Sequence, residues 1–89
     1  MKKPTFDPLT RSQAVDTAIQ AYLAVLILRL QEAEKLAVDA SSAMRAGKRN
    51  LTIGTILPLE CMLPECEALV RASLILHRMA PESAEGGAP

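Results

Sequence analysis

The residues that could carry chemistry are few, namely two cysteines, Cys61 and Cys66, and one histidine, His77. Cysteine and histidine are common zinc ligands, and they also serve as nucleophile and base in covalent catalysis. The cysteines lie five positions apart, which on a helix would point them about 140° from each other. That spacing fits neither a zinc signature nor a disulfide within one helix. We expect both cysteines to be small buried thiols.

His77 precedes Arg78 near the end of an expected helix, where a cation or imidazole interacts favourably with the helix dipole. Any catalytic Ser-His or Cys-His pair would have to use this histidine. We interpret it instead as a residue that interacts with the helix dipole, or as a partly buried core residue. The chain has no glycine-rich phosphate loop and no H-E-x-x-H motif. We therefore predict a non-enzyme, with no catalytic, cofactor-binding or metal-binding residues and no cofactor.

The charge balance limits the classes of partner that can be expected. The chain has 89 residues, enough for one small domain, and ten basic residues balance ten acidic ones. A neutral chain has no general attraction to nucleic acid or anionic membrane. Arg45, Lys48 and Arg49 form a local excess of positive charge, which we interpret as a solvated helix end. Nucleic acid is therefore not the expected partner.

No secretory signal pattern is found at the N-terminus, so we expect a cytoplasmic protein. The longest uncharged run in the long helix lies between Asp16 and Arg29. It is shorter than the 18 or more apolar residues of a spanning helix. We predict no membrane span.

The first element that could position a site is one long helix, predicted from Thr10 to Gly47. Thr10 with Gln13 fits a capping box, and Gly47 can take the left-handed conformation that ends helices. No proline or glycine lies between them. Such a helix would be roughly 50 Å long, which suggests a coiled coil or a bundle.

Apolar residues follow one another along this helix at alternating steps of three and four, the spacing of a heptad seam. The predicted seam comprises Leu23, Leu26, Leu30, Ala33, Ala37, Ala40 and Met44, extended by Val15 and Ile19. Val25, Leu28 and Leu36 lie off this seam. A single neighbouring helix would leave them exposed, so they predict a second neighbour.

Proline divides the second half of the chain. Lys48 to Thr55 has β-branched residues and is expected to be an ordered loop. Ile56 to Leu63 is expected to be a short helical stretch. Pro64 should break or kink it, because a proline inside a helix removes a hydrogen bond and clashes with the preceding turn. A helix is predicted from there to Ala80, and Pro81 stops it.

The sequence thus predicts an all-α helical hairpin, with one long N-terminal helix, a loop and a shorter, proline-kinked second helix, assembling with another chain. Residues 1–9 are expected to be an extended segment, 10–80 the hairpin domain and 81–89 a disordered tail. Both helices have apolar faces too broad for a two-helix hairpin to bury, which predicts a protein partner or self-association. The predicted partner-binding residues are Tyr22, Val25, Leu28, Leu36, Val70, Leu74 and His77.

Two stretches resemble a known family. Residues 67–80 read EALVRASLILHRMA, and residues 43–47, which end the preceding helix, read AMRAG. Together they resemble the small two-helix co-chaperones of type III secretion needle subunits, the YscE-like proteins. The resemblance implies an antiparallel hairpin that joins a tetratricopeptide-type chaperone and helps to keep the needle subunit unpolymerised in the cytoplasm.

A second resemblance gives the alternative. Residues 46–52, AGKRNLT, follow a long helix and are similar to the second loop of histone folds, whose central helix is similar to residues 18–26. This resemblance implies an obligate dimer that contacts DNA through the basic loop. Salt-dependent binding to DNA would distinguish the two.

Overall fold

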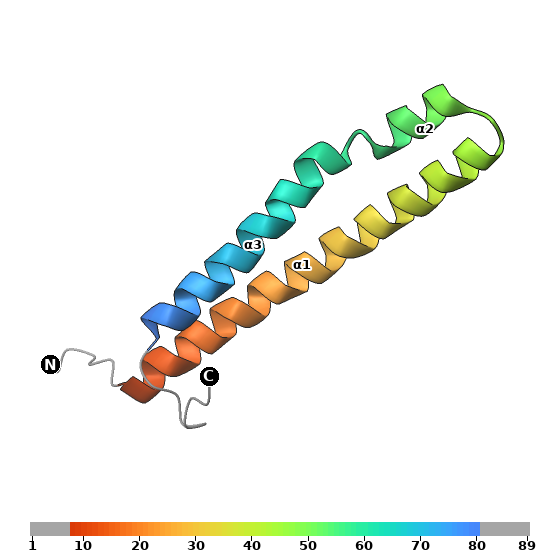
Figure 1. Cartoon of the computed structure of the whole chain (residues 1–89). Helices are drawn as coiled ribbons and strands as arrows, with labels where there is room; N and C mark the ends of the chain where they lie inside the picture. Colours follow the sequence, from red (N-terminus) through yellow and green to blue (C-terminus); the bar gives the residue numbers. More distant parts are fainter. Residues whose placement is uncertain (1–7, 81–89) are drawn as a thin grey trace, which may run out of the picture.

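The protein is a helical hairpin. The computed structural model describes residues 8–80, with side chains from residue 11 onward. It contains α1 (Pro8–Arg45), α2 (Arg49–Ile56) and α3 (Leu59–Met79), and no strand within those residues. Figure 1 shows α1 as one arm, and α2 and α3 in line as the antiparallel second arm. The predicted all-α hairpin with a long N-terminal helix is confirmed.

The long helix begins earlier than predicted. It includes Pro8 and Leu9, which we had assigned to the extended segment, so Thr10 lies inside the helix rather than at its cap. Proline suits a first helical turn because the amides there have no intrahelical partner. The predictions for residues 1–7 and 81–89 lie outside the described residues.

Gly47 turns the chain at the end of α1, here called the tip, as the sequence predicted. Its φ of 77° is left-handed, which costs glycine nothing and other residues strain. The Gly47 amide donates to the Met44 carbonyl and the Lys48 amide to the Ala43 carbonyl, both at 2.9 Å. These two bonds are the Schellman pattern, and they satisfy carbonyls that the helix end leaves without partners.

The predicted loop from Lys48 to Thr55 is wrong, because most of it forms α2. Two of its β-branched residues are accommodated by local bonds, in which Thr52 Oγ1 donates to the Lys48 carbonyl and Thr55 Oγ1 to the Leu51 carbonyl. Both threonines are half-buried, and α2 packs on α1. Tertiary packing therefore outweighs weak helix propensity in this short segment.

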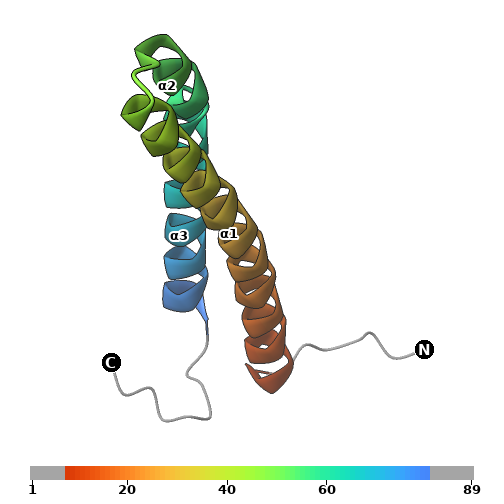
Figure 2. The same ribbon diagram turned by 90° about the vertical axis from the view of Figure 1, so that its right-hand side faces the viewer.

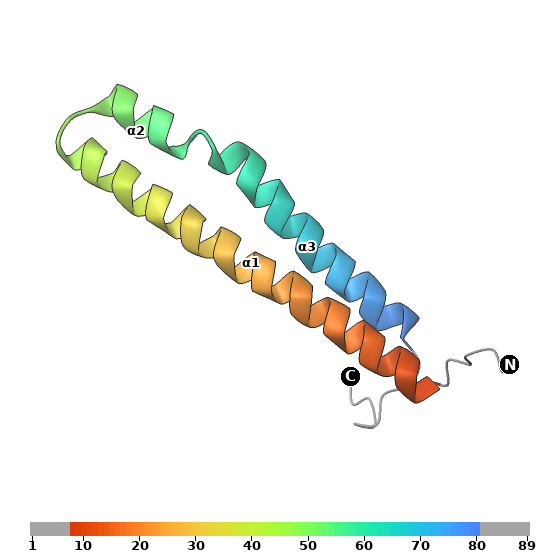
Figure 3. The same ribbon diagram turned by 180° about the vertical axis from the view of Figure 1, so that it is seen from behind.

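The proline interruption also lies elsewhere than predicted. The break between the helices falls at Leu57 and Pro58, both with right-handed helical dihedrals, so the second arm bends rather than reverses (Figure 3). α3 then runs through Pro64 without ending. Pro64 and Glu60 are exposed, so water can satisfy the Glu60 carbonyl that lacks its amide partner.

The hairpin seam on α1 differs in register from the predicted one. The less exposed residues repeat at three and four positions, as in a coiled coil. The seam consists of Ser12, Val15, Ile19, Tyr22, Leu26, Arg29, Ala33, Leu36, Ala40 and Ala43. Val15, Ile19, Leu26, Ala33 and Ala40 were correctly predicted.

Three large members of the predicted seam, Leu23, Leu30 and Met44, are exposed instead, as is Ala37. Leu36, placed off the seam by the sequence, is half-buried within it. Both registers share Leu26, Ala33 and Ala40, and differ in the second stripe. The helix therefore turns its less apolar stripe, which includes Arg29, toward the second arm.

The second arm continues the same spacing across the bend, so α2 and α3 act as one packing surface. Its buried and half-buried residues include Thr52, Thr55, Leu59, Met62, Cys66, Leu69, Ser73, Leu76 and Ala80. Ser73 satisfies its hydroxyl by donating to the Leu69 carbonyl at 2.9 Å.

The core is small. Its members in the described part of the chain are Ala33, Ala40, Ala43, Met62 and Cys66. Alanine allows helices to approach closely, and these residues lie in the half of the hairpin nearer the tip. Figure 2 shows the arms diverging toward the opposite, open end, where Tyr22, Leu26 and Leu76 are only half-buried.

Pro64→Ala should stabilise the protein, because it restores one helical hydrogen bond and removes a steric conflict that together cost about 3 kcal/mol in a helix interior. We expect urea denaturation to give an increase of about 1 to 3 kcal/mol in the free energy of unfolding. Pro58→Ala is the control, because the bend has no regular helix to restore and its effect should stay under about 1 kcal/mol. Equal effects of the two changes would contradict this account of Pro64.

Candidate protein-interaction surface

Large apolar side chains are mostly on the outside of this hairpin. None of the described leucines, isoleucines or valines is buried. The exposed large residues are Leu23, Val25, Ile27, Leu28, Leu30, Val38, Met44, Leu51, Ile53, Leu57, Leu63, Val70, Leu74, Ile75 and Met79. Single exposed apolar residues are ordinary, but a contiguous set marks an interaction surface.

Some of these residues form two parallel rows beside the seam. On α1, Leu23, Leu30 and Met44 repeat every seven residues together with the small exposed Ala37. On the second arm Leu63 and Val70 continue the repeat of the half-buried Ile56. In an antiparallel pair of helices, the positions that flank the seam in the same heptad place lie on the same side. The two rows therefore form one surface, which we call the uncharged face.

The other side of the seam differs in chemistry. Its flanking positions on α1 include Arg11, Val25, Glu32 and Asp39, and those on the second arm include Glu65. All five are exposed. Charged side chains at these positions are stable in water, so this side, the mixed face, does not need a cover along its whole length.

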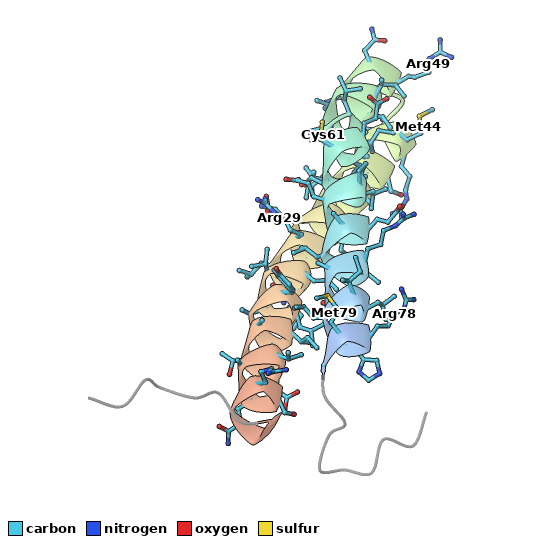
Figure 4. The ribbon with its side chains drawn as sticks, turned by 90° about the vertical axis from the view of Figure 1, so that its left-hand side faces the viewer. Arg29, Met44, Arg49, Cys61, Arg78 and Met79 are labelled. Atoms are coloured by element: carbon cyan, nitrogen blue, oxygen red, sulfur yellow. The ribbon has the colours of Figure 1, made fainter. Side chains whose placement is uncertain are left out.

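The side-chain view shows where one member of the uncharged face lies. In Figure 4, Met44 of α1 and Arg78 of α3 project to one side of the hairpin, whereas Arg29 and Cys61 project to the other. Met44 belongs to the uncharged face. Arg29 is bonded within its own helix, its guanidinium lying 3.4 Å from the Glu32 carboxylate.

The residues predicted to bind a partner do not form one surface. Tyr22 and Leu36 lie in the hairpin seam and are half-buried. Val25 is on the mixed face, and Leu28 points outward from α1 with 62% of its surface exposed. Val70 and His77 follow the row of the uncharged face on α3, and Leu74 lies at its edge.

The sequence prediction missed Leu23, Leu30, Met44 and Leu63 as exposed apolar residues. Their signal was present as the seven-residue repeat, but we assigned the α1 members of that repeat to the seam. An exposed row and a buried row have the same period, so periodicity alone cannot separate them.

The residues considered for chemistry lie apart. Cys66 is buried in the seam, and Cys61 is exposed on the outer side of α3, so the expectation of two buried thiols is wrong for Cys61. His77 is exposed. Over residues 11–80 no group of three or more His, Cys, Asp or Glu side chains is placed to hold a metal ion.

A shallow hollow of about 320 Å³ is lined by Arg71, Leu74, Ile75 and Arg78 on the outer side of α3. It lies on a single helix. Arg71 is engaged by the Glu67 carboxylate at 2.7 Å, an exposed pair that contributes little to stability. The hollow brings together no acid, base and nucleophile.

α1 is long and apolar enough to cross a membrane when judged by length and composition between Arg11 and Arg45. One such helix is weak evidence for a span, because the core helix of a soluble protein and a signal sequence pass the same test. Asp16 and Arg29 divide the apolar stretch, and a charge at the bilayer centre is costly.

No protein-family model matches the chain, and neither a curated protein nor a solved structure matches it.

The two thiols should differ in reactivity, because Cys61 is exposed and Cys66 is 6% exposed. We expect a thiol reagent to modify one cysteine per native chain promptly and the second only after unfolding. Cys61→Ala should abolish the prompt reaction. Cys66→Ala should keep it and lower the unfolding free energy by about 1 kcal/mol through lost packing. Two prompt thiols in the native protein would contradict the described seam.

Proposed function

We propose that this chain is a small, non-catalytic protein-binding subunit or chaperone-like adaptor that buries broad apolar helix faces against a partner. The observation that carries this proposal is the distribution of apolar side chains. Among the residues whose side chains the structure describes, five small or medium apolar residues are buried and fifteen large ones are exposed. A cytoplasmic location is part of the proposal.

The energetics support a partner. Full burial of a leucine, isoleucine or valine contributes about 1.5 to 3 kcal/mol, so covering the exposed half of one contributes about 1 kcal/mol. Covering eight of the fifteen exposed residues would then contribute about 8 kcal/mol, which is comparable to the stability of a whole domain. A two-helix hairpin of this size has a small core and gains much from that burial.

The more specific proposal is a co-chaperone of type III secretion needle subunits. The antiparallel hairpin agrees with the architecture that the resemblance implies, and Pro64 does not interrupt the second helix. A hairpin is a common architecture, so this agreement supports the specific role less strongly than the exposed surface supports protein binding. Co-expression with a needle subunit and its tetratricopeptide-type chaperone would test it, with a soluble ternary complex as the expected product.

The histone-like alternative gains no support from the fold. In the described residues no short helix precedes the long one, and the last helix has 21 residues packed along α1. Arg45, Lys48 and Arg49 lie together at the tip, where Arg45 donates to Ser41 Oγ at 3.4 Å. Three exposed cations on a neutral chain form a small electrostatic footprint for DNA.

Substitutions at Leu26 and at Leu28 should distinguish an effect on folding from an effect on partner binding. Leu26→Asp introduces a carboxylate into the half-buried seam and should reduce helicity measured by circular dichroism. Leu28→Asp alters a 62% exposed residue and should leave helicity unchanged while it weakens binding of a partner protein. Affinity purification from the native cell, followed by mass spectrometry, should find a stoichiometric partner with the wild type and lose it with Leu28→Asp.

If the wild type retains no other protein in stoichiometric amount, the adaptor role is wrong, whatever the chain does with itself. If Leu28→Asp unfolds the chain as badly as Leu26→Asp, the assignment of Leu28 to an exposed surface fails instead.

A further inference from the structure

The two rows of the uncharged face carry ionisable residues only at their ends. Along α1 the row runs from Asp16 through Leu23, Leu30 and Ala37 to Met44, at steps of seven residues. Along the second arm the row begins with Arg49 at the tip, continues through apolar residues to Val70, and ends with His77 at the open end. The acidic end of the face is thus at the open end, and the basic end is at the tip.

We propose that the uncharged face binds a second copy of this chain, with the two hairpins antiparallel and related by a two-fold axis across the face. In this arrangement Asp16 of each copy lies beside Arg49 of the other, so opposite charges meet twice. Among the described residues neither side chain forms an ion pair within its own chain. A parallel arrangement would place Asp16 beside Asp16 and Arg49 beside Arg49, which like-charge repulsion disfavours.

The apolar content of the face also suits self-association. A two-fold interface uses the same patch on both subunits, so the patch must be compatible with itself. Leu23 and Leu30 in the middle of the α1 row carry no charge, and Leu63 and Val70 on the second arm carry none. Bringing two such surfaces together therefore places no charged residue of the rows between the copies except at the row ends.

The width of the surface favours two further helices over one. Ile27 on α1 and Leu74 on α3 lie one stripe beyond the two rows, and both are exposed. The same stripes also carry exposed Glu34, Glu60 and Glu67, which would lie at the rim of an interface. A single helix placed between the rows would leave these edges in water. A second hairpin covers them and forms a four-helix bundle, an arrangement in which each helix contacts two neighbours.

The inference rests on the proposed function, in that it takes the exposed apolar residues to be an interaction surface. It is tested by sedimentation equilibrium of the full chain at low salt, because screening weakens exposed charge pairs. We expect a dimer for the wild type, and a dissociation constant raised about 10-fold by Asp16→Arg and by Arg49→Glu. The double variant, with the charges exchanged, should return to within about 3-fold of the wild type.

Substitutions of two apolar residues of α1 by aspartate give a matched comparison. Leu30→Asp, at the centre of the face, should weaken the dimer by about 100-fold or more. Val38→Asp, on the side of α1 opposite the seam, should leave the dissociation constant unchanged although Val38 is also exposed. Helicity measured by circular dichroism checks that each variant keeps its fold.

A wild-type monomer over the micromolar range would overturn the second-copy inference. So would tighter association of Asp16→Arg, which indicates parallel copies, or failure of the exchanged charges to restore association. A monomer that retains a different protein overturns the inference but leaves the proposed function standing. A dimer that retains no other protein, with the charge exchange behaving as expected, supports the inference and removes the adaptor role.

Discussion

The close contact between small residues near the tip is the interaction on which the rest of the structure depends. Ala40 is 3% exposed, and Ala33 and Ala43 are also buried. Side chains of this size let two helices approach, and Met62 and Cys66 from α3 complete the core. Methionine adapts well to irregular space. Toward the open end the larger seam residues, such as Tyr22, Leu26 and Leu76, are only half-buried.

The geometry of a helix pair explains which residues remain outside. α1 has apolar residues on several adjacent stripes over its middle third, but one neighbour can cover only two of them. The alanine stripe is common to both registers. Choosing the second stripe with Tyr22, Arg29 and Leu36 leaves the stripe with Leu23 and Leu30 outside. The surplus of apolar surface is therefore a property of the sequence that a hairpin cannot remove, whichever register it adopts.

The sequence was sufficient for the parts of the fold that depend on local chemistry. Gly47 predicted the turn, because few other residues take a left-handed conformation, and the lack of proline and glycine before it predicted one long helix. The register of the seam depended on the competition between stripes, which periodicity does not resolve. The helix at Arg49–Ile56 depended on packing against α1, and the tolerance of Pro64 on its exposure. The outward rows were visible as a repeat, but their exposure became clear only with the second arm in place.

The Gly47 turn also determines the order in which contacts can form. Residues on either side of the tip are close in sequence, so bringing Ala43 near Thr52 requires closing only a short loop, whereas bringing Val15 near Ala80 requires closing a much longer one. Loop-closure entropy rises with length, and local contacts speed folding. The most closely packed part of the hairpin is also the part whose loops are shortest. Folding can then nucleate at the tip, and contacts between the arms can form progressively toward the open end, which packs last.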